Sequence, residues 1–195
     1  MQRLPLDFPA FYQTDFLGRE EAAALFDEIV GGFDVTNKTM RMQDGSEHIA
    51  ETGSYIFTDP ELTSFDKLPE VWGGRSAWTE SLAGIRERIE VETGVRFQVA
   101  RCIYYQDGSE GVDFHRDLPA YGNTDEIASL SLGAEREFVL RRNSDHDDRF
   151  CIRLADGSLF FMGKGCQDLY EHALPHDEIC QQPRLNLTFR KYGWD

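Results

Sequence analysis

The 195-residue sequence has few cysteines, few basic residues and no long apolar run. Its four cysteines, Cys102, Cys151, Cys166 and Cys180, form no CxxC pair, which argues against a zinc ribbon, a thioredoxin-like redox site and a disulfide-rich secreted fold. No apolar segment approaches the ~20 residues of a transmembrane helix, and the N-terminus lacks the apolar core of a signal peptide. We therefore expect a cytoplasmic protein that has no membrane partner.

Basic side chains are outnumbered, with 20 Lys and Arg against 35 Asp and Glu and a formal net charge of −15. Proteins bind the phosphates of nucleic acids through clustered cations that release counterions. A chain this acidic is repelled by nucleic acid at long range unless its basic residues lie on one face. The charge therefore weakens, without excluding, a nucleic-acid partner.

Two amphipathic helices are predicted in the N-terminal half. Apolar residues recur at helical spacing from Leu17 to Val30, and two glycines follow as a stop. A second helix is expected from about Ser76, as N-cap, to Gly94. No repeat or linker divides the chain, and its length is that of one domain, so we expect residues 1–195 to form a single unit.

After Gly94 the pattern changes to short β-type segments separated by turn residues. The predicted strands are 97–105, 127–132, 137–141, 150–154, 158–162 and 185–190. Asp107-Gly108 and Asp156-Gly157 are typical of tight turns between such strands. We expect a mainly β fold with flanking helices (α+β), in which a sandwich or jelly roll carries the two helices outside one sheet.

His115 and Asp117 are two residues apart and share a face in an extended segment. Two imidazoles and one carboxylate on one side of an ion form the facial arrangement of non-haem Fe(II) oxygenases. A His-x-Asp pair alone is weak evidence, because such pairs are more often simply hydrogen-bonded or solvated. A metal here needs a third ligand from elsewhere in the chain.

His172 and His176 compete for the place of third ligand. His172 alternates with Tyr170 in a strand-like stretch, whereas His176 lies between Pro175 and two acidic residues, a composition typical of a solvated turn. The sequence favours His172.

The last predicted strand carries an alternating pattern. Arg184, Asn186, Thr188 and Arg190 share one face, and Leu185, Leu187 and Phe189 share the other. An inward polar face needs partners or a ligand, and two arginines could hold the two ends of one dicarboxylate. The alternative is an exposed sheet face with solvated arginines.

Together, the segments HRD (115–117), EHALP (171–175) and RLNLTFR (184–190) strongly resemble the AlkB-like family of Fe(II)/2-oxoglutarate dioxygenases. Residues 104–109, 127–134 and 154–159 also look like family segments. The resemblance covers about residues 97–192, and RxNxTFR is its most specific part.

The resemblance implies a double-stranded β-helix in which 96–195 form the catalytic core and 1–95 supply supporting helices and a substrate lid. It implies Fe(II) bound by His115, Asp117 and His172, which serve as the catalytic centre, with 2-oxoglutarate as cosubstrate and O2 as oxidant. The expected 2-oxoglutarate ligands are Arg184 and Arg190 for the carboxylates and Tyr105, Asn186 and Thr188 for further hydrogen bonds.

Two departures from the family concern cosubstrate and substrate. Ile103 stands where base-repairing relatives tend to have an asparagine, and Asp117 is followed by Leu118-Pro119-Ala120-Tyr121 where they usually carry acidic residues that recognise the damaged base. Aromatics of the lid region, among them Tyr55, Phe57, Phe65 and Trp72, offer stacking surfaces, and arginines such as Arg116 could form a basic rim. We expect Tyr55 and Arg116 to contact substrate.

Three hypotheses follow. The first is a dioxygenase that hydroxylates or oxidatively dealkylates its substrate, with an N-alkylated nucleobase as one candidate. The second is the same chemistry on a small molecule or protein side chain, and the third is a non-catalytic metal-binding module. We expect a monomer in each case.

Overall fold

The computed structural model describes residues 1–42, 44–64, 73–119 and 122–193. Its helices are α1 (Arg19–Gly32), α2 (Glu80–Thr93), the short α3 (Cys166–Leu169) and the 3-10 turn η1 (Pro60–Leu62). The strands, in chain order, are β1 (Gln2–Arg3), β2 (Ala10–Gln13), β3 (Thr39–Arg41), β4 (Glu47–Ile49), β5 (Gly53–Thr58), β6 (Gly74–Ala77), β7 (Val99–Tyr105), β8 (Val112–His115), β9 (Ile127–Gly133), β10 (Arg136–Arg142), β11 (Asp145–Leu154), β12 (Leu159–Met162), β13 (Tyr170–Leu174) and β14 (Arg184–Arg190).

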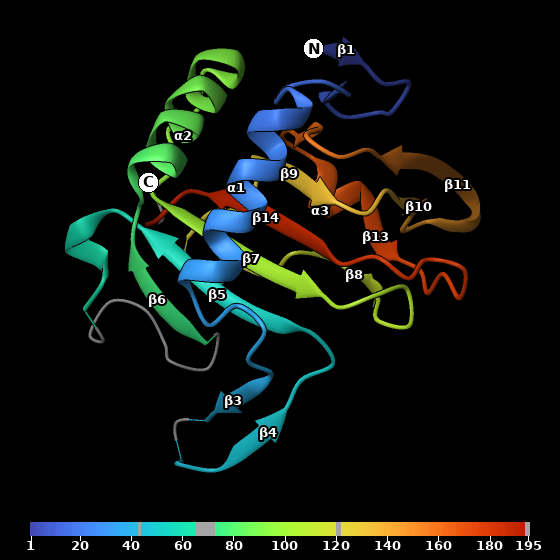
Figure 1. Cartoon of the computed structure of the whole chain (residues 1–195). Helices are drawn as coiled ribbons and strands as arrows, with labels where there is room; N and C mark the ends of the chain where they lie inside the picture. Colours follow the sequence, from blue (N-terminus) through green and yellow to red (C-terminus); the bar gives the residue numbers. More distant parts are fainter. Residues whose placement is uncertain (43, 65–72, 120–121, 194–195) are drawn as a thin grey trace.

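The strands form one large and one small sheet that face each other. The large sheet has the order β1-β2-β12-β9-β14-β7-β5-β6, and the small one has the order β11-β10-β13-β8. Helices α1 and α2 lie on the same side of the large sheet, and the β3–β4 hairpin projects beyond its lower edge (Figure 1). The predicted jelly roll with helices outside one sheet is confirmed.

Alternation along the strands of the large sheet separates two environments. Leu185, Leu187 and Phe189 of β14 pack in a core cluster that also contains Leu25 of α1 and Ile89 of α2. The polar residues of β14 therefore point the other way, between the two sheets. At the far end of this interior a second apolar cluster joins the sheets, through Phe160 of β12, Leu140 of β10 and neighbouring side chains. The polar part of the interior is thus confined to the other end.

The second helix begins later than its sequence predicts. Thr79 is the N-cap, and its side chain accepts a hydrogen bond from the backbone N–H of Leu82 at 3.1 Å. Ser76, the predicted N-cap, belongs to β6, which pairs in parallel with β5. Because Ser76 pairs in a strand, the predicted start of the helix was wrong by about one turn. The predicted end was right, since Gly94 ends the helix in the left-handed conformation with φ 71°.

The N-terminal half contributes more β-structure than its sequence predicts. Strands β5 and β6 extend the large sheet beside β7, and β1 and β2 extend it at the opposite edge. These strands are short, and β2 and β5 pair with β12 and β7, which are distant in sequence, so local patterns do not reveal them. Within the described segments, no helix is both long and apolar enough to cross a membrane.

Candidate metal and cosubstrate site

A pocket of about 360 Å³ lies between the two sheets. The large sheet supplies polar side chains from β7, β9 and β14, and the small sheet supplies His115, His172 and the apolar Phe138 and Leu174. A cavity of this size suits a small organic acid, because ligand pockets typically range over roughly 300–1,000 Å³.

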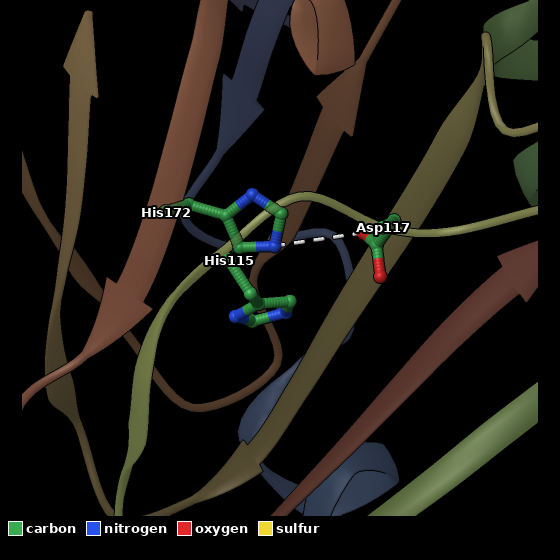
Figure 2. A group of neighbouring side chains, drawn as sticks. All are labelled: His115, Asp117 and His172. Carbon is green, nitrogen blue, oxygen red and sulfur yellow. Dashed lines mark ion pairs between the residues drawn. The ribbon is translucent and has the colours of Figure 1, made fainter. Parts of the chain in front are cut away.

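His115, Asp117 and His172 meet on the small-sheet side of this pocket. One donor atom from each lies within 4.8 Å of the other two. Figure 2 shows His172 on β13 and His115 at the end of β8, with the Asp117 carboxylate beside the His172 ring. The His172 Nε2 to Asp117 Oδ2 distance is 3.5 Å. Two imidazoles and one carboxylate converging in this way form a site for a divalent cation.

Strand register brings the two histidines together. His115 and His172 are directly paired across β8 and β13, and their ring centroids are 4.4 Å apart. Asp117 follows the end of β8, where its backbone N–H donates to Oε1 of Gln167 at 2.8 Å. A one-residue slip of either strand would turn one imidazole to the opposite face of the sheet.

The protonation states fit a metal. Burial lowers the pKa of His172 to about 4, although Asp117 opposes the shift, so the ring is neutral at pH 7. Burial alone would raise the pKa of Asp117, but the charges of Arg190, His172 and His115 have the larger effect. Together they hold this pKa below its usual value of 3.8. The His115 Nδ1 lies 2.8 Å from the carbonyl oxygen of Asp113, to which it donates, so Nε2 keeps its lone pair for a ligand.

Arg184 lies at the opposite end of β14 from Arg190. It is 1% exposed, it donates to Ser131 Oγ at 3.0 Å, and its guanidinium carbon lies 5.4 Å from the centre of the Tyr105 ring. Burial lowers its pKa to about 10, which still leaves it charged at neutral pH. Among the described residues, Arg184 has no carboxylate partner. A buried cation without a counter-charge is well suited to one carboxylate of a bound dicarboxylate.

Arg190 contacts the metal-site carboxylate. Its Nη2 donates to Asp117 Oδ1 at 2.6 Å, and its Nε donates to Thr188 Oγ1 at 3.2 Å. Oδ1 of Asp117 is therefore occupied, while Oδ2 faces His172. The resemblance assigned Arg190 to 2-oxoglutarate, and its position beside Asp117 shows that it also orients a potential metal ligand.

Asn186 and Thr188 lie between the two arginines. Asn186 Nδ2 donates to Ser129 Oγ at 2.8 Å and to the Leu130 carbonyl at 3.1 Å, which fixes the amide and leaves its oxygen available. Both residues line the pocket, as does Tyr105. Burial raises the Tyr105 pKa, so its hydroxyl stays protonated and can donate to an anion.

A family model described as the 2OG-Fe(II) oxygenase superfamily matches residues 10–190. The chain belongs to this superfamily. Similar proteins include AlkB homologues. "Alpha-ketoglutarate-dependent dioxygenase alkB homolog 3" of Mus musculus is 37% identical over 149 residues, which are 69% of this chain and 52% of that protein. The human "DNA oxidative demethylase ALKBH2" is 31% identical over 191 residues, covering 91% of this chain and 71% of that protein.

The chain spans about half the length of the AlkB homolog 3 proteins that it matches, with 52% of the mouse protein and 50% of the rat protein covered. A solved structure titled "The structure of OsALKBH1" superposes with a TM-score of 0.67 over 97% of this chain and 99% of that one, at 17% identity. This likeness shows the shared fold.

Other predicted residues of this AlkB-like oxygenase lie away from the pocket. Tyr55 is on the opposite face of β5, where its ring packs against Phe33 at 5.4 Å and Phe57 at 5.2 Å, so its position argues against the predicted contact with substrate. Arg116 is exposed, between the two ligands His115 and Asp117, and does not line the pocket. Phe65 and Trp72 fall outside the described residues.

His176 is not part of the donor cluster. The His176 Nδ1 lies 2.7 Å from the Ser109 carbonyl, and its ring is exposed. Two further arginines that could have joined a basic rim, Arg141 and Arg142, are neutralised locally. Arg141 pairs with Glu171, and Arg142 pairs with Asp7 and Asp148.

Several pocket residues escaped the sequence analysis of this oxygenase. Arg101 of β7 lines the pocket with Tyr105, and Ser129 and Ser131 of β9 accept hydrogen bonds from Asn186 and Arg184. Alternate residues of a strand share a face, so the position of Tyr105 in β7 predicts that Arg101, four residues earlier, lies on the same face. No local pattern predicts that the two serines contact Arg184 and Asn186, because these contacts depend on the pairing between β9 and β14.

Proposed function

We propose that this chain is an AlkB-like Fe(II)/2-oxoglutarate dioxygenase that removes alkyl groups from the nitrogens of alkylated nucleobases by oxidation. The observation that carries the proposal is the joint presence, in one pocket, of the His115–Asp117–His172 donor set and the buried Arg184, which no carboxylate of the described residues neutralises. A metal site alone would suit many reactions, whereas a metal site beside a carboxylate-binding cation suits a chelating oxo-acid cosubstrate.

In this proposal His115, Asp117 and His172 hold Fe(II), and Arg184 and Tyr105 hold the distal carboxylate of 2-oxoglutarate. When bound, Fe(II) and 2-oxoglutarate supply, with O2, the oxidation of a substrate C–H bond, and succinate and carbon dioxide are the co-products. Arg190 keeps Asp117 ionised and oriented, Asn186 and Thr188 position the cosubstrate, and the apolar Phe138 and Leu174 limit water at the site.

Relatives support the choice of substrate, because the human relative is named a DNA oxidative demethylase. Hydroxylation of a carbon attached to nitrogen gives a hemiaminal, which loses an aldehyde and leaves the base unmodified. The reaction therefore needs no further catalytic group beyond those that hold the cosubstrates and place the alkyl carbon at the metal.

The test is aerobic turnover of the full chain with Fe(II), 2-oxoglutarate and an oligonucleotide that carries an N-methylated base. We expect succinate, formaldehyde and unmethylated base in equal amounts, and loss of all three in Asp117→Asn. Absence of succinate after anaerobic loading with Fe(II) would contradict the proposed chemistry. Succinate without loss of the methyl group from any methylated base would contradict the proposed substrate.

A second candidate is the same chemistry on a small molecule or protein side chain. Leu118, directly after Asp117, is 75% exposed, and the net charge is −15. An apolar side chain beside the metal and an acidic surface both suit an uncharged partner better than a polyanion. We also propose, from the sequence, that the protein is monomeric and cytoplasmic.

A further inference from the structure

Arg101 is a third cation in the pocket, and the proposed reaction gives it no role. It lies in β7 and lines the pocket with Arg184 and Arg190. Its Nε is buried, and no described residue accepts a hydrogen bond from it. No carboxylate of the described chain forms an ion pair with its guanidinium. A half-buried cation without a counter-charge is costly unless a ligand satisfies it.

The other two arginines are already accounted for. Arg190 is neutralised by Asp117, and Arg184 lies at the far end of β14, over Tyr105. Arg101 and Tyr105 are four residues apart in β7, so their Cα atoms are separated by about 13 Å at ~3.3 Å per residue. Arg101 and Arg184 therefore serve different ends of the pocket.

Register places Arg101 at the metal end. It is directly paired with Thr188 of β14, and the Thr188 hydroxyl lies 3.4 Å from the Arg101 carbonyl oxygen. Paired residues of antiparallel strands project from the same face of the sheet. Thr188 is in turn bonded to Arg190, which holds Asp117. On its other side Arg101 pairs with Ile56 of β5, the strand from the N-terminal half.

Three carboxylates line the pocket with Arg101. Glu51 is exposed and accepts from the Gly111 backbone N–H at 2.9 Å, and it faces His176. Asp113 is also exposed. Asp117 is held by Arg190. Among the described residues, none of these carboxylates forms an ion pair with Arg101, so its guanidinium keeps its positive charge for a ligand.

We infer that Arg101 selects the substrate by donating to a carbonyl oxygen beside the alkylated nitrogen, so that the enzyme prefers neutral lactam bases to cationic ones. This inference rests on the proposed function. In 3-methylthymine the methylated nitrogen is flanked by two carbonyl groups, and the base is uncharged. In 3-methylcytosine the methylated ring carries a positive charge at neutral pH. An arginine at this place stabilises the first and repels the second.

The experiment compares wild-type protein, Arg101→Met and the control Arg19→Met on oligonucleotides of one sequence that carry either 3-methylthymine or 3-methylcytosine. Methionine keeps most of the length of the side chain, and Arg19 is exposed at the start of α1. Demethylation is measured as kcat/KM, and binding is measured by fluorescence anisotropy without oxygen, in the presence of Fe(II) and 2-oxoglutarate. Binding gives a readout that does not depend on turnover.

We expect wild type and Arg19→Met to favour the 3-methylthymine oligonucleotide in both measurements. Arg101→Met should shift the ratio of the two kcat/KM values at least tenfold toward 3-methylcytosine, with the KM for 2-oxoglutarate unchanged. Arg101→Lys should keep part of the preference, because the charge remains.

An unchanged ratio in Arg101→Met would overturn the inference and leave the proposed function intact. A tenfold higher KM for 2-oxoglutarate would also overturn it, since Arg101 would then bind cosubstrate. If wild-type protein forms succinate but demethylates neither oligonucleotide, the proposed substrate fails together with the inference.

Discussion

Burial sets the charge of each group in the pocket at the scale of single residues. Arg184 is 1% exposed, and it stays protonated because even its lowered pKa, about 10, lies well above neutral pH. His172 is neutral for the same physical reason, since burial disfavours the charged form of a base. One cation and one neutral imidazole, on facing sheets, therefore offer an anion site and a metal-ligand site within one cavity.

Replacing Arg184 by glutamine should raise the KM for 2-oxoglutarate by roughly 10- to 150-fold, because a hydrogen bond to a charged group contributes about 1.5–3 kcal/mol. The KM is measured from succinate formation at fixed Fe(II). Arg19→Gln, an exposed change of the same charge, should leave it unchanged. Equal KM values for wild type and Arg184→Gln would show that another residue binds the carboxylate.

Acidification should destabilise the metal-free protein through His172. Its folded pKa of about 4 lies below the ordinary 6.5, so between these values the unfolded chain binds a proton that the folded chain does not. The stability that depends on the neutral ring is present above pH 6.5 and is lost as pH falls toward 4. At pH 5 we expect a loss on the order of 2 kcal/mol relative to pH 7.5.

Chemical denaturation at the two pH values measures this loss. His172→Asn should remove that part of the pH dependence, and His146→Asn, which changes an exposed ring, should retain it. The same pH dependence in both variants would contradict the assignment to His172.

At the scale of secondary-structure elements, short segments hold the site in place. The four-residue α3 precedes β13 and places Gln167 so that it accepts the Asp117 backbone N–H. Nε2 of Gln167 is buried, and no described residue accepts from it. The metal-site carboxylate is thus fixed through its side chain by β14 and through its backbone by α3.

Replacing Gln167 by leucine should weaken Mn(II) binding to the protein by roughly 10- to 100-fold, the usual effect of losing a group that orients a metal ligand. The Kd is measured by isothermal titration calorimetry, and Tm of the metal-free protein reports any general destabilisation. Asp168→Asn, on the same helix and exposed, is the control. A wild-type Kd in Gln167→Leu would show that Arg190 alone orients Asp117.

At the scale of the whole molecule, the site lies between the two sheets, which also meet through the apolar cluster of Phe160 and Leu140. His115 and His172 belong to the small sheet, while Arg190, which holds Asp117, belongs to the large one. A cation held by His115, Asp117 and His172 would bind only the folded chain, because strand pairing brings these ligands together. Metal binding would therefore be coupled to folding.

Mn(II) at about 100 times its Kd should raise Tm by roughly 5–10 °C, since such binding contributes about 2.7 kcal/mol and each kcal/mol shifts Tm by about 2–4 °C at this size. Differential scanning calorimetry measures the shift. Asp117→Asn should abolish it, and Asp113→Asn, which removes an exposed carboxylate, should keep it. A shift that survives Asp117→Asn would place the metal elsewhere.

The sequence by itself determined the local patterns. Period-two alternation assigned the two faces of β14, helical spacing located α1 and most of α2, and the motif spacing singled out His115, Asp117 and His172. These features depend on neighbours in the chain, whose geometry is fixed by backbone periodicity.

Only the tertiary structure decided which residues share the pocket. It packed Tyr55 against the core on the other face of β5, paired Arg190 with Asp117 and left the Nε of Arg101 without an acceptor among the described residues. The physical reason is that counter-charges and packing partners come from strands distant in sequence, so the register between strands decides whether a side chain is neutralised, buried or free to meet a ligand.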